Sequence, residues 1–493
     1  MAGKNFDRKR KPASGRLVAL SAGLVVLMVV PLLALGGDAA DSEAGATSGR
    51  SKFVTRPGFD APVLQVTRSE PEASSGRIFV GSKDVGKAIY RSDGELVWFR
   101  PGRATDFRSQ RFRGRPVLTW FEAPTKGSGL KGNRLLIADR KYRIFRKLKP
   151  GRGYVADSHE FRLTPRGTAY STIYKARPRD LTAFGGTVND RVSDSIAQEI
   201  DIRTGRVVWQ WRSLRHVPIS DTVVDKRKKP GNPFDYFHIN SIADTPDGNI
   251  LISGRGTNAI YKVSRKTGRI LWTLGGKRSD FRMADGATFF QQHDAQVVRG
   301  GRISLFDNTA SPTVTARPRE QSRGLVLALD HKEKVARVAR QFFHPSRPLS
   351  EHQANTQPLG NGNYLVGWGA VPLISEHLPS GRVVFDARVL GISSFYRAYR
   401  MPWDGLAPGR PLVVARQGEA GSSIYVSWNG DTRVKKWRVR GGNSSGNLRV
   451  LKTVPREGFE TRIGIGPASR WVRVEGLDAR GKRIGTSKPV RVG

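Results

Sequence analysis

Gly268-Arg-Ile-Leu-Trp272 is one copy of a phrase that recurs along the chain and decides its fold. The phrase consists of a glycine, a charged residue, two apolar residues and an aromatic residue. It returns as Gly94-Glu-Leu-Val-Trp98, Gly205-Arg-Val-Val-Trp209 and Gly381-Arg-Val-Val-Phe385. A turn glycine followed by a short apolar and aromatic run is typical of a β-strand. The four copies therefore indicate a β unit that is repeated.

The spacing of the copies predicts about six units. The first and last of the three intervals between copies are nearly twice the middle one. Degenerate copies, at Tyr142-Arg-Ile-Phe145 and Lys334-Val-Ala-Arg-Val338, fall inside the two long intervals. The repeat length is somewhat above the roughly 40 to 50 residues of common β-propeller blades, and radial repetition protects sheet edges. We therefore predict an all-β chain with a six-bladed β-propeller over residues 53–408. A large β-sandwich is the alternative, but it does not account for the copies.

A second phrase places histidines at matching points of these units. Each copy has a histidine, a short strand and then a glycine, with the glycine 8 or 10 positions after the histidine. The four histidines are His159, His238, His293 and His352. Equivalent points of successive blades lie around one axis. If these strands are the inner ones, the four side chains ring the mouth of the central channel.

The N-terminal region reads as an export signal. Residues 1–16 are basic, and the following 19 residues, up to Leu35, contain no charge, which is about the length of a membrane-spanning helix. We predict a transmembrane anchor or signal sequence at residues 17–36 and a flexible linker at 37–52. Either form places the rest of the chain outside the cytoplasm. The protein is then single-pass at the cell membrane, or secreted if the segment is cleaved.

The sequence pattern changes near the C-terminus. Residues 409–493 hold short strands that tend to alternate in twos and are separated by turn residues. This pattern predicts a small β-sandwich that is similar to fibronectin type III and other immunoglobulin-like modules. It contains no recognisable catalytic set, so an accessory role, a carbohydrate-facing role and a plain spacer all remain open.

Composition narrows the chemistry. The chain has 493 residues, no cysteine and a formal net charge of +42, so disulfides, thiol nucleophiles and thiolate metal sites are excluded. The basic residues are scattered and no RNA- or DNA-binding pattern accompanies them, which favours anionic small molecules or lipid over nucleic acid. No hydrolase elbow, P-loop or metal-binding motif is present, and we expect neither a metal nor another cofactor.

Histidine chemistry remains. A neutral imidazole is a good nucleophile near pH 7, and a second imidazole can protonate a departing oxygen. Arginine and an amide can stabilise an oxyanion in the transition state. Sulfuryl transfer, like phosphoryl transfer, needs mostly positioning and charge stabilisation. A basic channel ringed by histidines suits that reaction.

These residues resemble the arylsulfate sulfotransferases, the bacterial enzymes that need no nucleotide sulfate donor. The resemblance covers about residues 53–408. The motifs that carry it are Asp235-Tyr-Phe-His-Ile-Asn-Ser241, Asn258-Ala-Ile-Tyr-Lys-Val263, Ile270-Leu-Trp-Thr-Leu-Gly-Gly-Lys277, Gln292-His-Asp-Ala295, Leu305-Phe-Asp-Asn308, Ser322-Arg-Gly324, Gly360-Asn-Gly-Asn363 and Val366-Gly-Trp-Gly369. The family implies a six-bladed propeller that transfers sulfate from a phenolic ester to a phenol through a sulfohistidine.

The resemblance also assigns roles. It implies that His293 is the nucleophile, that His238 and Asn240 bind the sulfuryl oxygens and assist proton transfer, and that Arg255 belongs to the catalytic set. His159 is the expected additional channel histidine. The assignment of His352 to substrate binding rests on the spacing alone. The chain departs from the family at Gly256, where members often carry a histidine after the arginine.

Two other functions remain open. The first is a non-enzymatic extracellular propeller that binds glycans or proteins. The second is a quinoprotein dehydrogenase, which ranks last because such propellers usually have eight blades and hold calcium. The other four histidines sit in polar turns and are predicted to lie at the surface: His216, His331, His344 and His377. The sequence names neither the physiological donor and acceptor nor the oligomeric state.

Overall fold

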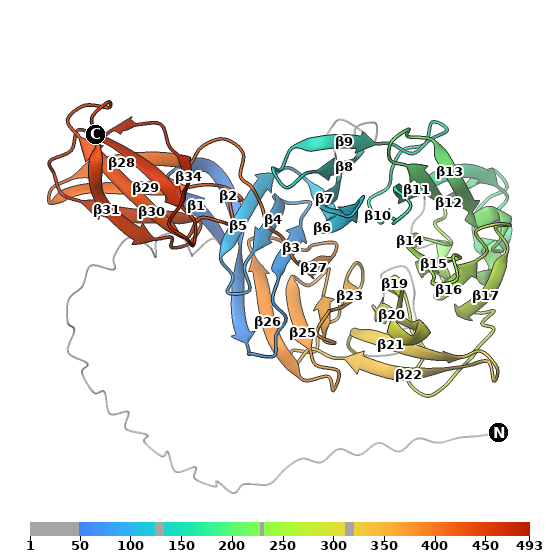
Figure 1. Ribbon diagram of the computed structural model, residues 1–493. Coiled ribbons are helices and arrows are strands. Elements are labelled where there is room, and N and C mark those ends of the chain that lie inside the picture. Colours follow the sequence, from blue (N-terminus) through green and yellow to red (C-terminus); the bar gives the residue numbers. More distant parts are fainter. Residues whose placement is uncertain (1–48, 124–132, 227–230, 311–319) are drawn as a thin grey trace, which may run out of the picture. The chain divides into compact units, whose positions relative to one another are not determined.

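A computed structural model describes residues 49–123, 133–226, 231–310 and 320–493 of the chain (Figure 1). Strands dominate these residues, and the helical segments among them are single 3-10 turns. The predicted all-β fold is confirmed. The 3-10 turns are η3 (Thr182–Phe184), η4 (Ser213–Arg215), η5 (Ile219–Asp221), η7 (Arg255–Thr257) and η8 (Arg299–Gly301).

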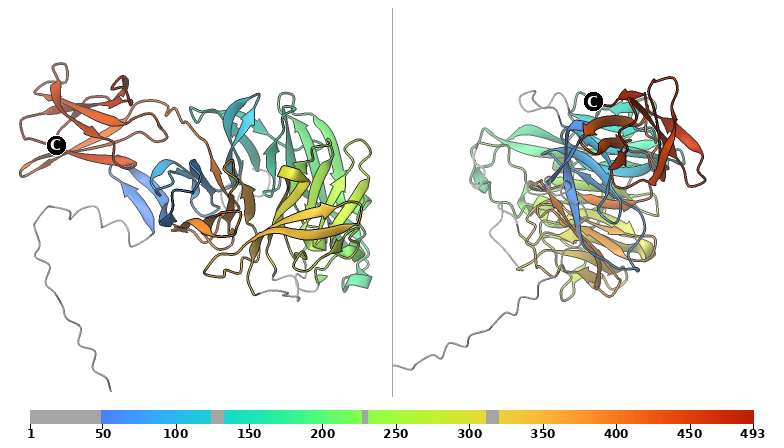
Figure 2. Two further views of the ribbon diagram at one scale, coloured as in Figure 1. Left: turned by 60° about the horizontal axis from the view of Figure 1, so that its bottom comes forward. Right: turned by 90° about the vertical axis from the view of Figure 1, so that its left-hand side faces the viewer.

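Six sheets, antiparallel except for one edge strand, succeed one another through the larger part of the described chain (Figure 1, Figure 2). Three of them consist of four consecutive strands each. The first of these contains β6 (Ala104–Phe112), β7 (Arg115–Glu122), β8 (Arg134–Ala138) and β9 (Ile144–Leu148). The next contains β10 (Phe161–Leu163), β11 (Thr168–Arg179), β12 (Asp190–Asp201) and β13 (Val207–Arg212). The third contains β14 (Ile239–Asp244), β15 (Ile250–Gly254), β16 (Ala259–Val263) and β17 (Ile270–Gly275).

A fourth sheet carries an extra parallel edge strand. Its order is β18-β22-β21-β20-β19, and β18 pairs in parallel with β22. The strands are β18 (Arg282–Met283), β19 (His293–Val298), β20 (Arg302–Asp307), β21 (Arg323–Asp330) and β22 (Val335–Phe342).

The remaining two sheets join segments from both ends of this region. One has the order β27-β3-β4-β5, and the other β1-β2-β26-β25-β24-β23. Ala398 of β27 pairs with Val80 of β3, and β2 pairs with β26. The strands are β1 (Arg50–Phe53), β2 (Arg56–Ser69), β3 (Arg77–Gly81), β4 (Gly86–Tyr90), β5 (Leu96–Pro101), β23 (Asn355–Pro358), β24 (Tyr364–Gly367), β25 (Leu373–His377), β26 (Val383–Leu390) and β27 (Ala398–Met401).

The repeated phrase of the sequence has one structural meaning. All six copies, including the two degenerate ones, stand at the start of the last strand of a four-strand run, in the order β5, β9, β13, β17, β22 and β26. The turn before that strand needs a positive φ. Glycine supplies it in the clear copies, for example Gly268 with φ 74°. Tyr142 and Lys334 adopt φ of 59° and 50° in the degenerate ones, where a side chain costs about 1–2 kcal/mol.

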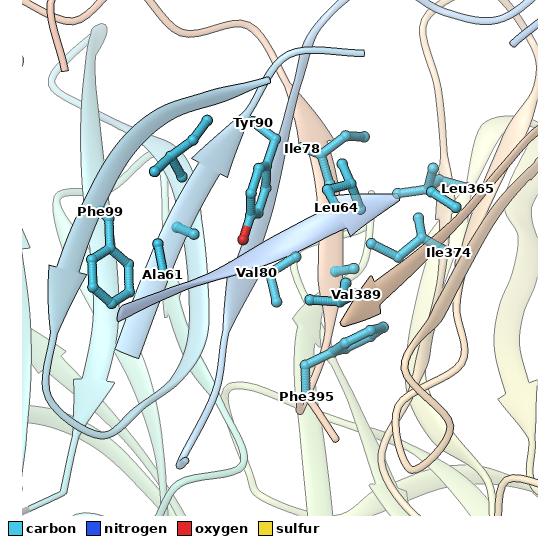
Figure 3. Packing of buried hydrophobic residues seen from close by; sticks show 14 of the residues in the cluster. Ala61, Leu64, Ile78, Val80, Tyr90, Phe99, Leu365, Ile374, Val389 and Phe395 are labelled. Atoms are coloured by element: carbon cyan, nitrogen blue, oxygen red, sulfur yellow. The ribbon is translucent and has the colours of Figure 1, made fainter. Parts of the chain in front are cut away.

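Side chains from adjoining sheets form the cores. Figure 3 shows one cluster in which Leu64, Val80, Leu365 and Val389 come from different strands and pack together. The hydroxyl of Tyr90, in the same cluster, donates to the carbonyl of Pro62 at 2.7 Å. Strands such as β15 are buried along their whole length because neighbouring sheets cover both faces, and such strands read as continuous apolar runs.

Two small sheets follow near the C-terminus, with a core that includes the fully buried Trp437. The side chain of Asn429 exchanges two hydrogen bonds with the backbone of Phe99, at 3.0 and 2.9 Å, and all described residues belong to one compact unit. The strands are β28 (Leu412–Gly418), β29 (Gly421–Ser427) and β32 (Glu460–Ile465) in one sheet, and β30 (Lys436–Gly442), β31 (Arg449–Pro455), β33 (Trp471–Leu477), β34 (Arg483–Thr486) and β35 (Val490–Arg491) in the other.

The predicted anchor at residues 17–36 lies outside the described residues. In the part of the chain that the structure describes, no helix has the length and apolar character needed to cross a membrane.

Candidate functional site

The first strands of successive sheets carry the predicted histidines. His159 lies two residues before β10, His238 lies directly before β14, and His293 is the first residue of β19. His352 lies in the segment that leads into β23. The histidine phrase therefore marks one equivalent position in four consecutive sheets.

His159 and His238 form a contacting pair. Their ring centroids are 4.9 Å apart and the rings meet edge to face at 84°. Tyr174 lies 5.6 Å from each of the two rings, and Tyr396 lies 5.5 Å from His159. The side chains of His159 and His238 retain 18% and 22% exposure, so both rings are reachable from solvent.

A carboxylate holds each ring of this pair. Nδ1 of His159 lies 2.5 Å from Oδ2 of Asp157, and Nδ1 of His238 lies 2.5 Å from Oδ2 of Asp235. A carboxylate accepts the Nδ1 proton, so Nε2 of each neutral ring carries the lone pair. Burial raises the pKa of Asp157, but His159 outweighs it and lowers that pKa to about 2. Burial lowers the pKa of His238, and Asp235 opposes this shift.

His293 lies deeper, at 1% exposure, and Asn308 fixes its tautomer. The Nδ2 group of Asn308 donates to the carbonyls of Ser350 and Gln353 at 2.7 and 3.1 Å, so its Oδ1 faces the histidine. That oxygen lies 2.7 Å from Nδ1 of His293 and can only accept. Nδ1 therefore carries the proton, and Nε2 carries the lone pair that a nucleophile needs. Burial, with the charge of Arg255, lowers the pKa of His293 well below its ordinary value and keeps the ring neutral.

A strap, defined as residues 350–354, covers Nε2 of His293. The backbone N–H of Gln353 points at Nε2 of His293 from 3.3 Å. Gln353 and Ala354 have φ of 66° and 85°, a region that costs a non-glycine residue about 1–3 kcal/mol. His352 belongs to the strap, but its own ring is exposed and no described residue hydrogen-bonds to it.

The side chains of Asn240 and Arg255, from the sheet that contains β14, approach His293 and the strap. The Nδ2 group of Asn240 donates to the carbonyl of Gln292 at 2.6 Å, directly before His293. Its Oδ1 is buried and has no hydrogen-bond partner among the described residues. Arg255 opens η7 and donates from its backbone to the carbonyl of His238 at 3.0 Å. Its Nη2 donates to the strap carbonyl of Glu351 at 3.2 Å.

The departure at Gly256 has a backbone cause. A Cβ atom at Gly256 would lie 2.4 Å from the carbonyl oxygen of Tyr236, which is far inside van der Waals contact. The backbone of η7 thus runs too close to the chain before His238 to admit a side chain. A histidine at this position requires a different local path.

A pocket of about 40 Å³ opens beside these groups and is lined by Asp235, His238 and Arg255. A water needs about 10–15 Å³ on this measure, so the pocket holds a few waters or one small oxyanion. An aryl sulfate requires more room. His293, which is enclosed, does not line this pocket.

Beneath the site lies a fully buried ion cluster that the sequence analysis did not identify. Nη1 of Arg397 lies 3.3, 3.2 and 3.5 Å from carboxylate oxygens of Asp106, Glu160 and Asp294, respectively. Nη2 of Arg397 donates to the carbonyl of Asn240 at 2.8 Å. Burial raises the pKa of Asp294, which Arg397 opposes. The cluster therefore holds the strands that carry Asn240 and His293 at fixed spacing.

Sequence reasoning also missed Asp157, Asp235 and the tautomer role of Asn308. The available signal was an acidic residue two positions before His159 and three positions before His238. Two histidines predicted at the surface are instead buried, and that prediction is wrong. His344 is 5% exposed and His377 is fully buried, because the latter lies in the central strand β25, where Ser375 and the carbonyl of Gly381 satisfy its ring nitrogens.

Three histidines, an arginine and an amide thus converge, and the described residues include no group of three histidine or carboxylate side chains placed to hold a metal ion. No curated protein matches the sequence significantly. Among solved structures, a protein of unknown function from Bacteroides caccae is 14% identical, with 66% of this chain and 98% of that chain covered and a TM-score of 0.39.

Catalytically inactive virginiamycin B lyase from Staphylococcus aureus is 10% identical, with 84% and 95% of the two chains covered and a TM-score of 0.27. Such distant structural likenesses carry no argument about function. The family model described as arylsulfotransferase (ASST) matches residues 108–389, more than half of the chain. This range contains the channel histidines, Asn240 and Arg255. The chain therefore belongs to the arylsulfotransferase family, a membership that supports aryl sulfotransferase activity on small aryl sulfates and phenols.

Proposed function

We propose that the chain is an exported, membrane-anchored aryl sulfotransferase that works through a sulfohistidine on His293. In this proposal a six-bladed propeller over residues 53–408 carries the site, and residues 409–493 form a fibronectin III-like sandwich. The observation that carries the proposal is the tautomer of His293. Its Nδ1 proton is held by Asn308, its Nε2 keeps the lone pair, and the charges of Arg255, His238 and His159 act on the ring.

In the first half-reaction, the Nε2 lone pair of His293 forms a bond to sulfur of the aryl sulfate. The sulfur–oxygen ester bond breaks, and its electron pair leaves on the aryl oxygen. That oxygen takes a proton from the protonated ring of His238 or His159, and the phenol departs. Nδ1 of His293 keeps its proton throughout.

In the second half-reaction, an acceptor phenol gives its proton to the same, now neutral, imidazole. Its oxygen bonds to sulfur, the N–S bond breaks, and the electron pair returns to Nε2 of His293. The carboxylates of Asp157 and Asp235 orient the two rings and stabilise the charge that each gains. The cycle closes with every proton accounted for.

Arg255 supplies the electrostatic part of this mechanism. Its guanidinium is largely buried, and burial lowers its pKa while Asp235 raises it. Because water is excluded, a positive charge here stabilises the sulfuryl oxygens more strongly than it would at the surface. Asn240 adds an amide beside the sulfuryl group. The strap must move away from Nε2 of His293 before the donor can bind.

The decisive experiment uses the donor alone. Incubation of the protein with p-nitrophenyl sulfate without acceptor should release a burst of about one phenol per chain, because the nucleophile is used once. Intact mass should rise by one SO3 unit, and the adduct should be labile in acid. His293→Asn should lose burst and adduct together, whereas His331→Asn, at an exposed turn, should keep both. An unchanged burst in His293→Asn would refute the assignment of the nucleophile.

Export needs its own test. A periplasmic-type reporter fused after Gly493 should be active only outside the cytoplasm, because the basic residues 1–16 hold the N-terminus inside. Sequencing the mature N-terminus distinguishes an anchor from a cleaved signal. A reporter that is active in the cytoplasm would contradict export.

A further inference from the structure

A pocket of about 640 Å³ lies at the C-terminal sheets, and none of the channel histidines lines it. Four cations reach it from separate segments: Lys141, Arg410, Arg433 and Arg473. No carboxylate is among its lining residues. Trp428 and Gly485 are among the remaining lining residues.

Most of this positive charge is uncompensated. Arg433 pairs at 2.7 Å with the fully buried Asp431, which neutralises one cation. Among the described residues, no ion pair engages Lys141, Arg410 or Arg473. Nε of Arg473 is buried without a hydrogen-bond partner there, although an unsatisfied buried donor ordinarily costs about 1–3 kcal/mol. The pocket is thus lined by three cations that no described carboxylate pairs with.

The excess of positive charge continues along the sheet that contains β30 and β33. Arg473 of β33 stands directly opposite Arg440 of β30 in the strand register, an arrangement in which like charges destabilise a sheet. Two residues along β33, Glu475 is shared by Arg438, Arg440 and Arg483, at 3.4, 3.0 and 3.3 Å. Three arginines therefore share one carboxylate, and Arg473 adds a fourth positive charge. We call Arg438, Arg440, Arg473 and Arg483 the arginine strip.

The floor of the pocket is fixed in shape. Trp428 is 4% exposed, and its Nε1 donates to the carbonyl of Pro408 at 3.3 Å. Its ring packs against Gly485, where an added Cβ would lie 2.3 Å from the ring. A pocket with a rigid floor and charged side chains around it needs little reorganisation to bind a ligand.

We propose that this pocket and the arginine strip bind an anionic glycan through its sulfate or phosphate ester groups. Guanidinium groups pair with such oxyanions in a bidentate manner. The pocket is larger than one oxyanion needs, and the strip extends the positive charge beyond it, which fits a chain of repeated anionic groups. Single-stranded nucleic acid requires aromatic rings on which bases stack, and the one aromatic lining residue, Trp428, is buried.

The test measures binding by isothermal titration calorimetry with dextran sulfate, a phosphorylated mannan and uncharged dextran. Wild type should bind at least one charged polymer and not dextran, with an affinity that falls as salt rises. The double variant Arg410→Gln/Arg473→Gln should lose about tenfold or more in affinity, because two charge-assisted contacts disappear. Comparing the two charged polymers identifies the preferred ester.

The matched control is the double variant Arg416→Gln/Arg462→Gln, which removes the same two charges from exposed positions on β28 and β32 in the other C-terminal sheet. It should bind as wild type does. Equal losses in the control and in Arg410→Gln/Arg473→Gln would show attraction by net charge alone and overturn the proposal. Absence of binding to both charged polymers would also overturn it, as would equally tight, equally variant-sensitive binding of a random oligonucleotide. Burst activity with p-nitrophenyl sulfate should be unchanged in all variants, so this test is independent of the sulfotransferase proposal.

Discussion

Asn308 accepts a 2.7 Å hydrogen bond from Nδ1 of His293 and is itself oriented by two carbonyls of the strap. One amide thus fixes both the tautomer of His293 and the position of the segment above it. Coupling of this kind predicts that substitutions at Asn308 change the chemistry of the site without removing His293.

Asn308→Leu should lower kcat/KM by a factor on the order of 10² or more, because the ring then loses the shorter of its two Nδ1 acceptors. It keeps only the carbonyl of Gln291, at 3.2 Å, to hold the proton on Nδ1. Nitrogen NMR of labelled histidine should show His293 passing from one tautomer to a mixture. Asn308→Asp retains an acceptor, so it should keep the tautomer even if the added charge reduces turnover. A single unchanged tautomer in Asn308→Leu would contradict this account.

The His238 dyad should set the acid limb of the second half-reaction. That step needs a neutral imidazole, and burial lowers the pKa of His238 below the ordinary 6.5. Activity should therefore persist below pH 6.5 and fall only as the pH drops through the lowered value. In Asp235→Asn the carboxylate that favours the charged ring is gone, so the limb should move to still lower pH while kcat falls. The pH profile of kcat/KM for the acceptor measures both, and a limb that moves to higher pH would refute the dyad.

The strap should protect His293 from modification. Brief treatment with diethyl pyrocarbonate, followed by mass spectrometry, should label the exposed His331 and His352 well before His293. Gly369 has φ 59°, and a Cβ there would lie 2.4 Å from the backbone nitrogen of Ala354. Gly369→Ala should therefore displace the strap, lower stability by about 1–3 kcal/mol and speed labelling of His293. Labelling of His293 at the rate of His331 in wild type would show that no strap closes the site.

His377 should make folding stability fall in mild acid. Burial lowers its pKa to about 4, against 6.5 in the unfolded chain, so between these values the unfolded state binds the proton and the folded state does not. Stability is then full above pH 6.5 and falls by about 3 kcal/mol as the pH drops towards 4. Urea titrations should show a shallower decline for His377→Gln than for wild type. His331→Gln, at an exposed turn, should decline as wild type does.

The repeats explain why so much of the fold was predictable. A turn with positive φ precedes the last strand of each four-strand run, and glycine marks it in the sequence. The histidines followed because each occupies the same point of its unit. His377 was misassigned because its neighbours in the sequence are polar, which is also typical of a surface turn. In the structure these neighbours, Ser375 among them, lie inside the sheet and satisfy the ring nitrogens of His377.

The partners that orient the site were harder to foresee because they come from distant parts of the chain. Asn308 meets Ser350 and Gln353 only after the sheets of β20 and β23 approach. Arg397 reaches Asp106 across 291 positions of sequence. No local pattern encodes such pairings, and the strained backbone of the strap breaks the preferences that local reasoning relies on.

The pairing of β27 with β3 also constrains when the molecule can form. Residues 77–81 emerge early in synthesis, yet their partner strand at 398–401 is made only after most of the chain. Until then β3 carries an open edge, and contacts so distant in sequence are associated with slow folding and with aggregation of the unfinished chain. A chain whose first sheet is completed by one of its late strands therefore reaches its final fold only when synthesis is nearly finished.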